Sequence, residues 1–312
     1  MLPIIAIIGP TASGKTQLAL DLAKTHPIEV ISLDSALIYQ DMDIGTAKPS
    51  RLEQSQVPHH LIDIITPLQN YSAADFVHDA KKLIAQIHSK NKIPVIVGGT
   101  MMYFKALTEG LNDLPQADEH IRAQLQQQKA QFGLSSLYQQ LKEVDPITAA
   151  RLKENDSQRI ERALEVFLLT NKPMSEHFAQ AQKNHTPLPI TTLALIPENR
   201  AQLHKKIALR FEQMLAQGFL TEVTHLREKY PTLTEHMPSM RCVGYRQAWL
   251  YLDQHIDYAQ MVEQGIIATR QLAKRQLTWL RQLKSQYIVD PYSPEGLQIA
   301  LNTLEQHINL SL

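Results

Sequence analysis

Unbroken apolar runs alternate with amphipathic patterns in the first third of the chain. The runs are rich in β-branched side chains and occupy residues 4–8, 30–33 and 94–97. Such runs are typical of parallel strands that are buried on both faces. Apolar residues at helical spacing predict helices over residues 16–25 and 73–90, the second behind a capping box that begins at Ser72. The alternation predicts an α/β fold with a parallel sheet flanked by helices.

The pattern changes near Asp118, beyond which we find only helical periodicity up to about Pro173. Helices are predicted there over residues 119–132, 135–144, 148–153 and 158–170. After a linker at residues 182–189, the predicted elements are a strand at 191–196, helices at 200–217, 245–253 and 258–284, and a strand at 287–289. We therefore expect a core domain of residues 1–117 and 190–312, and an all-helical insertion domain of residues 118–189.

Composition narrows the class of protein. The 312 residues are 44% apolar, and 31 Lys and Arg balance 31 Asp and Glu, which argues against disorder and against non-specific binding of polyanions by the whole chain. The single cysteine, Cys242, excludes an internal disulfide framework and a four-cysteine zinc site. Because no apolar run approaches ~20 residues and the N-terminus lacks the positive start of a signal peptide, we expect a cytoplasmic protein.

A phosphate-binding loop follows the first apolar run. The motif G-x-x-x-x-G-K-[ST] is matched by Gly9, Pro10, Thr11, Ala12, Ser13, Gly14, Lys15 and Thr16. Its backbone N–H groups and the start of the next helix can surround phosphate oxygens, Lys15 adds a positive charge, and Thr16 can bind Mg²⁺. The motif predicts a bound diphosphate or triphosphate. It leaves open whether the ligand is ATP, with Asp34 supporting Mg²⁺, or an organic diphosphate ester whose diphosphate is the leaving group.

Polar residues also follow the other two runs. Asp34 and Ser35 come directly after the second run, and Gly98, Gly99 and Thr100 come after the third. Ligands of α/β proteins bind at this carboxyl edge of the sheet. A carboxylate there can hold Mg²⁺ or accept a proton, while the Thr100 hydroxyl can contact a substrate or cap the next helix.

Further blocks, in the same order along the chain, resemble the tRNA dimethylallyltransferase (isopentenyltransferase) family. They are residues 34–39 (DSALIY), 42–49 (MDIGTAKP), 57–63 (VPHHLID), 97–100 (VGGT), 155–159 (NDSQR) and 241–247 (RCVGYRQ). The resemblance implies a P-loop NTPase-like core. It also implies transfer of the dimethylallyl group of dimethylallyl diphosphate to N6 of adenosine 37, just 3′ of the anticodon, in tRNAs that read codons beginning with U.

The resemblance implies roles for individual residues. Residues 9–16 would bind the diphosphate, with Thr16 holding Mg²⁺ through it; Asp34 would be the general base, and Thr100 would lie beside the reacting centre. The implied tRNA contacts are Asp34, Ser35, Ala36, Leu37, Thr100, Arg122, Gln158, Arg159, Ile160, Glu161, Arg162, Arg241, Cys242, Val243, Gly244, Tyr245, Arg246, Lys274, Arg275, Gln276, Leu277, Thr278, Trp279, Leu280 and Arg281. Many members carry Gln where this chain has Leu37, so only backbone contact is expected there.

The insertion domain would contact the anticodon stem-loop, with the target nucleotide flipped out, and we expect the protein to act as a monomer. The residues alone allow plainer interpretations. Arg270, Lys274, Thr278 and Arg281 form one stripe at helical spacing, which suits RNA phosphates or simple solvation. Arg159 and Arg162, with Glu161 and Glu165 nearby, suit a surface ion-pair lattice. A metal site at His59 and His60 is disfavoured, and Trp279 is expected in the core.

Three other functions fit parts of this sequence. A kinase or ATPase needs only the phosphate-binding loop and Asp34. A prenyltransferase acting on free adenine nucleotides would share both of these, but it would have no use for the insertion or the basic stripe. A nucleotide-binding RNA chaperone would need no chemistry at all.

Overall fold

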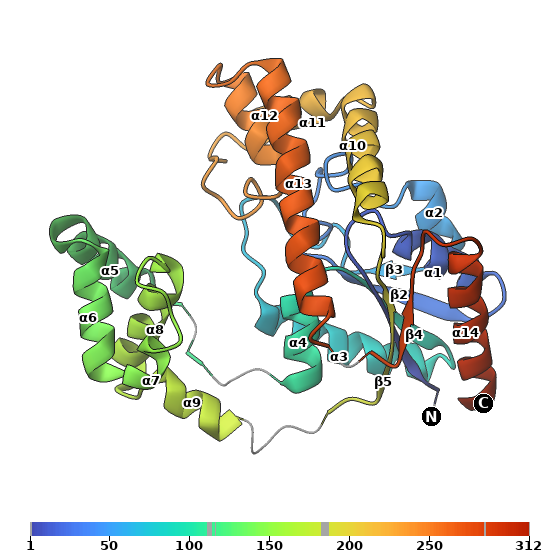
Figure 1. Cartoon of the computed structure of the whole chain (residues 1–312), viewed down its shortest axis with the longest axis horizontal. Coiled ribbons are helices and arrows are strands. Elements are labelled where there is room, and N and C mark those ends of the chain that lie inside the picture. The colour runs from blue at the N-terminus through green and yellow to red at the C-terminus, as the bar shows by residue number, and fades with distance from the viewer. Residues whose placement is uncertain (1, 111–113, 116, 182–186, 284, 312) are drawn as a thin grey trace. The chain divides into compact units, whose positions relative to one another are not determined.

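The computed structural model describes residues 2–110, 114–115, 117–181, 187–283 and 285–311. The chain divides into two compact units (Figure 1), a larger one of residues 1–105 and 189–312 and a smaller one of residues 106–188. Part of the predicted linker and one basic residue of the predicted last helix, Lys284, lie outside the described residues. None of the described helices is long and apolar enough to cross a membrane.

The larger unit contains a six-stranded sheet in the order β3-β2-β4-β1-β5-β6. The strands are β1 (Ile4–Ile8), β2 (Ile28–Leu33), β3 (His59–His60), β4 (Ile93–Gly98), β5 (Ile190–Leu195) and β6 (Tyr287–Val289). Every pairing between them is parallel. The predicted α/β fold with a parallel sheet is confirmed, and the three leading strands lie where their apolar runs predict them.

Helices of the larger unit pack on the sheet and extend beyond it. They are α1 (Lys15–Ala23), α2 (Arg51–Gln56), α3 (Ala73–Ser89), α10 (Arg200–Ala216), α11 (Phe219–Lys229), α12 (Tyr245–Leu252), α13 (Tyr258–Leu280) and α14 (Gly296–Ser311), together with the start of α4 (Met101–Glu109). The capping box of α3 is present, because the Ser72 hydroxyl accepts from the Asp75 N–H and the Asp75 carboxylate accepts from Ser72. The sequence patterns do not predict α2, α4, α11 or α14.

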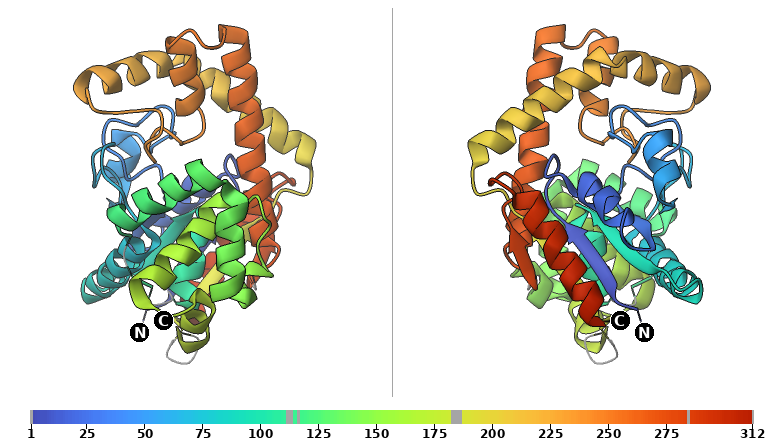
Figure 2. Two further views of the ribbon diagram at one scale, coloured as in Figure 1. Left: turned by 90° about the vertical axis from the view of Figure 1, so that its left-hand side faces the viewer. Right: turned by 90° about the vertical axis from the view of Figure 1, so that its right-hand side faces the viewer.

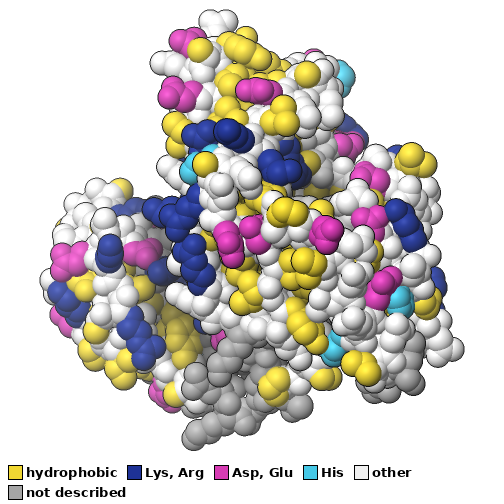
Figure 3. Space-filling model, turned by 45° about the vertical axis from the view of Figure 1, so that its right-hand side comes forward, with side chains coloured by type: hydrophobic (Ala, Val, Ile, Leu, Met, Phe, Trp, Pro, Cys, Tyr) yellow, Lys and Arg dark blue, Asp and Glu magenta, His cyan; other side chains and the backbone are white. Residues whose placement is uncertain are grey.

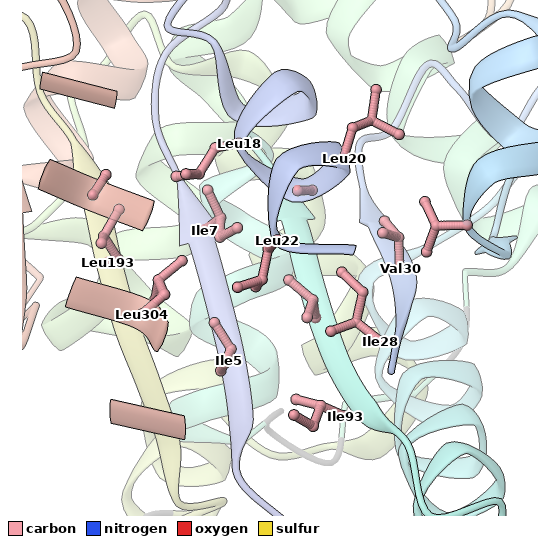
Figure 4. Close-up of a cluster of buried hydrophobic side chains, with 14 of the residues drawn as sticks. Ile5, Ile7, Leu18, Leu20, Leu22, Ile28, Val30, Ile93, Leu193 and Leu304 are labelled. Atoms are coloured by element: carbon pink, nitrogen blue, oxygen red, sulfur yellow. The ribbon is translucent and has the colours of Figure 1, made fainter. Parts of the chain in front are cut away.

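The core of the sheet explains why β1 contains no polar residue. Leu18 and Leu22 of α1 and Leu304 of α14 pack over Ile5 and Ile7 of β1 on one face (Figure 4). The intervening residues of β1 point to the other face and are buried as well. A strand covered on both faces gains hydrophobic stabilisation from every side chain, so its sequence does not alternate.

A second core lies in the bundle of α10, α11, α12 and α13 (Figure 2). Phe211 of α10, Phe219 of α11 and Tyr245 of α12 meet edge to face, with ring centroids 6.3 Å and 5.0 Å apart. Ile38, Tyr39 and Met42, from the segment after β2, pack into the same core. The bundle is thereby tied to the loops at the carboxyl edge of the sheet.

The smaller unit is built from helices around its own core. They are α5 (Glu119–Phe132), α6 (Leu134–Val144), α7 (Pro146–Ala149), α8 (Ser157–Thr170) and α9 (Met174–Ala181), and the core includes Leu137, Leu141 and Leu164. The helix predicted over residues 148–153 is only the short α7. Helix α9 contradicts the prediction that Lys172-Pro173 ends the helical run: proline is tolerated at a helix start, because the N–H that it lacks has no partner there.

A buried carboxylate connects β2, β3 and the segment around β4, at the amino end of the strands. Glu29, 2% exposed, accepts hydrogen bonds from Lys92 Nζ at 2.9 Å, Lys90 Nζ at 3.1 Å and His60 Nε2 at 2.8 Å. Burial by itself would raise the pKa of Glu29. The hydrogen bonds from Lys92, His60 and Lys90 outweigh burial and lower this pKa to about 2.

We expect Glu29→Gln to flatten the acid dependence of stability. A carboxyl group with a lowered native pKa stabilises the fold above its ordinary pKa of about 4.5, and this contribution, up to about 3 kcal/mol, is lost as the pH falls from 4.5 to 2. Urea unfolding at pH 7 and pH 3 measures it. The exposed Glu228→Gln is the matched control. Equal acid dependence in the wild type and in Glu29→Gln would contradict the assignment.

Candidate active site

The phosphate-binding loop lies between β1 and α1, as the motif predicts. Ala12 at φ 65° and Gly14 at φ 87° turn the chain into the first turn of α1. A Cβ on Gly9 would lie 2.6 Å from Ser13 Oγ and 2.9 Å from the Leu195 carbonyl oxygen, so only glycine fits there. Lys15 Nζ donates to the Pro10 carbonyl across the loop at 2.7 Å, and Thr16 is exposed at the mouth of the loop. The phosphate-binding loop that the motif predicts is confirmed, and so is the P-loop NTPase-like core that the family resemblance implies.

Two cations and a carboxylate line one pocket at this edge of the sheet. The pocket, of about 270 Å³, is lined by Lys15, by Asp34 after β2 and by Arg210 of α10. Burial, followed by the Arg210 charge, lowers the pKa of Lys15 to about 8, against the opposing effect of Asp34. Burial raises the pKa of Asp34, although the Ala36 N–H and the Lys15 charge oppose the shift. The pocket therefore suits an anionic ligand beside a carboxylate of increased basicity.

Hydrogen bonds hold the segments after β2 and β4 together. Asp34 Oδ1 accepts from the Ala36 N–H at 2.8 Å, and Thr100 Oγ1 accepts from the Ser35 N–H at 3.0 Å. The strands themselves are in close contact, because a Cβ on Gly98 would lie 2.1 Å from the Leu33 carbonyl oxygen. Thr100 therefore joins the two loops: its hydroxyl binds the backbone N–H of Ser35, the residue that follows Asp34.

Glu222 of α11 holds another wall of the pocket. Its carboxylate accepts from the backbone N–H groups of Asp43, Ile44 and Gly45 at 2.6–3.1 Å, and from the Tyr245 hydroxyl at 2.6 Å. Gly45, Thr46 and Ala47 line the pocket. The segment 42–49, one of the blocks that carry the family resemblance, is therefore positioned from the helical bundle.

The block at residues 241–247 is divided between the pocket and the core. Cys242 and Val243 line the pocket, Gly244 and Tyr245 are buried, and Arg241 and Arg246 are exposed. Burial, followed by the Asp34 charge, raises the pKa of the Cys242 thiol to about 12. The thiol is protonated at neutral pH and is a poor nucleophile.

Helix α13 presents different residues on two of its faces. Thr269, Leu272 and Gln276 line the pocket. A separate groove between α10 and α13 is lined by the whole predicted basic stripe and by three residues of α10. Its polar members are Arg200, His204, Arg270, Gln271, Lys274, Thr278 and Arg281. Figure 3 shows exposed Lys and Arg side chains on the larger unit, with Asp and Glu side chains elsewhere on the same face. Among the described residues that line the groove, none is acidic.

The other α13 residues that the resemblance implies as RNA contacts differ in exposure. Arg275 is exposed, whereas Leu277 and Leu280 are in the core. Trp279 is half-buried, and Lys105 Nζ lies 5.5 Å from its ring centroid. Arg270 Nε is buried and has no hydrogen-bond partner among the described atoms.

In the segment 34–37, Ser35 is exposed, and Ala36 and Leu37 line the pocket.

In the smaller unit, ion pairs engage most of the predicted RNA contacts. Arg122 Nε and Arg162 Nη1 donate to the buried Glu165 at 2.9 Å and 2.6 Å, and Glu161 accepts from Lys129 at 2.7 Å. Ile160 is fully buried in the core of this unit. Gln158 and Arg159 are exposed. Arg159 Nη1 lies 3.4 Å from Asp156 Oδ2. Both arginines of this helix therefore pair with carboxylates, although the partner of Arg159 is Asp156 and not Glu161.

The adjacent histidines are structural. His59 Nδ1 lies 2.8 Å from the Val57 carbonyl oxygen and His60 binds Glu29. Within the described part of the chain, no group of three or more His, Cys, Asp or Glu side chains could hold a metal ion.

Sequence reasoning missed Arg210, Glu222 and the inward orientation of Gln276. Arg210 does carry a signal, because it lies at helical spacing within the buried stripe Leu203, Ile207 and Phe211 of α10. A charged residue on a buried face is rare unless it is paired or functional. Glu222 and Gln276 carry the same kind of signal, because apolar residues flank them at helical spacing: Phe219 and Leu226 for Glu222, and Leu272, Ala273 and Leu280 for Gln276.

Proteins with similar sequences and folds are described as tRNA dimethylallyltransferases or tRNA isopentenylpyrophosphate transferases. The IPP transferase family profile matches residues 37–283. The chain is 62% identical to the tRNA dimethylallyltransferase of Neisseria meningitidis serogroup C (strain 053442) over 288 residues, which cover 92% of each chain. It superposes on the full-length tRNA isopentenylpyrophosphate transferase of Bacillus halodurans with a TM-score of 0.70, 32% identity and coverage of 99% and 97%.

A eukaryotic dimethylallyltransferase, solved as it acts on tRNA, superposes with a TM-score of 0.83 and 26% identity, covering 99% of this chain and 80% of its own. The profile match spans most of this chain, and the bacterial relative is similar over nearly its whole length. This chain therefore belongs to the IPP transferase family.

Proposed function

We propose that the protein transfers the dimethylallyl group of dimethylallyl diphosphate to N6 of adenosine 37, next to the anticodon, in tRNAs that read codons beginning with U. The products are N6-dimethylallyladenosine and diphosphate, and the protein acts as a monomer in the cytoplasm. The observation that carries the proposal is the single pocket in which Lys15 and Arg210 lie beside Asp34. Membership of the IPP transferase family supports it.

The cationic side of the pocket suits the leaving group. When the allylic C–O bond breaks, its electron pair leaves with the diphosphate while the carbon becomes electron-poor. The Thr11 N–H already donates to Gln276, so the N–H groups of the rest of the loop up to Thr16 and the charges of Lys15 and Arg210 would stabilise the negative charge that develops. Ser13 Oγ is buried and has no hydrogen-bond partner among the described atoms, so it offers a further donor at the bottom of the loop.

The carboxylate side suits the acceptor. As the N6 lone pair forms the new C–N bond, the nitrogen must lose a proton, and Asp34 would accept it. Burial raises the pKa of Asp34 and so makes the carboxylate a stronger base, while the neighbouring cations help to keep it ionised. Thr100 and Ser35 would hold this loop in place through their mutual hydrogen bond.

The residues present also fit Mg²⁺. The exposed Thr16 hydroxyl lies at the phosphate-binding loop, and the described part of the chain offers no cluster of three or more acidic, His or Cys ligands. An ion held by Thr16, by the diphosphate oxygens and by water fits the usual coordination of Mg²⁺. When bound, it would neutralise charge on the leaving group.

The groove between α10 and α13 would bind the RNA backbone. Arg270, Lys274 and Arg281 line it, and a basic groove without acidic neighbours suits phosphate groups. In the smaller unit, Gln158 and Arg159 are the exposed members of the predicted set and would contact the anticodon stem-loop. Exposed amide and guanidinium groups recognise the bases of single-stranded loops.

Labelled dimethylallyl diphosphate tests the proposed reaction. We expect the label to enter bulk tRNA in the absence of ATP, and a nucleoside digest to give N6-dimethylallyladenosine. Release of γ-phosphate from ATP without such labelling would instead indicate a kinase or ATPase. Preferential labelling of AMP over an anticodon stem-loop would indicate an enzyme for free nucleotides.

We expect Asp34→Asn to lower kcat by a factor on the order of 10² or more, because the amide cannot accept the N6 proton. The amide oxygen still allows the bond from the Ala36 N–H, so the affinity for tRNA should remain within about twofold. Single-turnover rates and filter binding measure the two effects. Lost tRNA binding with an unchanged rate at saturation would assign Asp34 to recognition instead.

We expect Lys274→Ala to weaken tRNA binding and to reduce the slope of log Kd against log salt by about one phosphate contact. The rate at saturating tRNA should not change, since Lys274 lines the groove and not the pocket. Lys82→Ala, an exposed lysine of α3, removes the same charge elsewhere and serves as control. If Lys274→Ala leaves the slope of log Kd against log salt unchanged, the basic stripe does not bind RNA phosphates and is only exposed to solvent.

A further inference from the structure

The side chain of Gln276 joins two loops that are far apart in the sequence. Its Oε1 accepts from the backbone N–H of Thr11 in the phosphate-binding loop at 2.9 Å, and its Nε2 donates to the carbonyl oxygen of Gly99 after β4 at 3.0 Å. Both faces of one primary amide, an acceptor and a donor, are thereby used. Among ordinary side chains of this length, only glutamine supplies this pair of groups.

The three segments meet at close range. A Cβ on Gly99 would lie 2.4 Å from Gln276 Nε2 and 3.0 Å from the Gly9 carbonyl oxygen. Glycine at residue 99 therefore allows the loop after β4, the phosphate-binding loop and α13 to converge. This close packing explains why the amide of Gln276 bonds two backbones at once.

The orientation of Gln276 separates it from its neighbours on α13. Gln276 is half-buried and lines the pocket, whereas Lys274 and Arg281 line the groove on another face of the helix. The amide of Gln276 is already bound to the backbone of Thr11 and Gly99. Gln276 therefore differs from exposed polar side chains, which are available to contact RNA. The family resemblance had placed it among the RNA contacts.

A series of hydrogen bonds runs from this amide to the carboxylate of the pocket. Gln276 holds Gly99, whose neighbour Thr100 accepts from the Ser35 N–H at 3.0 Å, and Ser35 directly follows Asp34. At its other end Gln276 holds Thr11. The loop that would bind the leaving group and the loop that carries the base are thus connected through one side chain.

We propose that Gln276 is a positioning residue that sets the phosphate-binding loop at a defined distance from the loop after β4, and through Thr100 and Ser35 from Asp34. The assignment rests on the proposed function. A displacement in which one group leaves as another attacks requires the two sites to be aligned, and a small misplacement costs rate more than binding. Gln276 supplies that alignment through the two backbone groups that it binds.

Two apolar variants test this role. Gln276→Met matches the unbranched shape of glutamine and Gln276→Leu does not, but each removes both hydrogen bonds. Gln264→Leu, at an exposed position of the same helix, is the matched control. The measurements are kcat, the KM for dimethylallyl diphosphate, the Kd and salt slope for an anticodon stem-loop, and calorimetric binding of inorganic diphosphate with Mg²⁺.

We expect both Gln276 variants to lose about tenfold or more in kcat and to bind inorganic diphosphate about three- to tenfold more weakly. The stem-loop Kd and its salt slope should equal those of the wild type. Weaker stem-loop binding with an unchanged saturated rate would overturn the proposal in favour of an RNA contact. Full activity and full diphosphate binding in Gln276→Met would also overturn it.

The control and the wild type separate this inference from the proposed function. Gln264→Leu should match the wild type in every measurement. If the wild type transfers no label to tRNA, the proposed function fails, while diphosphate binding by the Gln276 variants still decides whether this amide supports the phosphate-binding loop.

Discussion

The site depends on the burial of Lys15, Arg210 and Asp34 around one pocket. Burying two like charges side by side costs free energy, both because they lose contact with water and because they repel each other. The carboxylate of Asp34 offsets the repulsion between Lys15 and Arg210. Burial is the main cause of the lowered pKa of Lys15 and of the raised pKa of Asp34, and the attraction between the two groups opposes both shifts. With two cations and one carboxylate, the pocket has an excess of positive charge, which an anionic diphosphate would neutralise.

The rest of the larger unit brings these three groups together from separate elements. The parallel sheet places the ends of β1, β2 and β4 at one edge, which brings the phosphate-binding loop beside Asp34. The helical bundle supplies what the sheet lacks, namely Arg210 from α10 and Glu222 from α11. The core around Phe219 and Tyr245 therefore supports the site as well as the fold, because it holds the bundle against the segment that follows β2.

Helix α13 connects the chemistry of the pocket to the surface where we propose that RNA binds. Gln276 and Thr269 face the pocket, while Arg270 and Lys274 line the groove. Because a helix repeats every 3.6 residues, a few consecutive residues can serve both faces. A block of sequence that resembles a family's RNA-binding segment can therefore contain residues that perform another task.

Local patterns determined much of this protein. The apolar runs predict β1, β2 and β4, the motif at residues 9–16 predicts the phosphate-binding loop, and the capping box predicts α3, because strand burial, anion binding and helix capping each depend on neighbouring residues. Only the tertiary structure decided that Arg210 faces Asp34, that Glu222 holds the segment 43–45, and that Gln276 faces inward. These contacts join residues more than 170 positions apart. A helical pattern can show that a polar side chain lies on a buried face, but which distant group that side chain meets depends on how the helix packs against the rest of the fold.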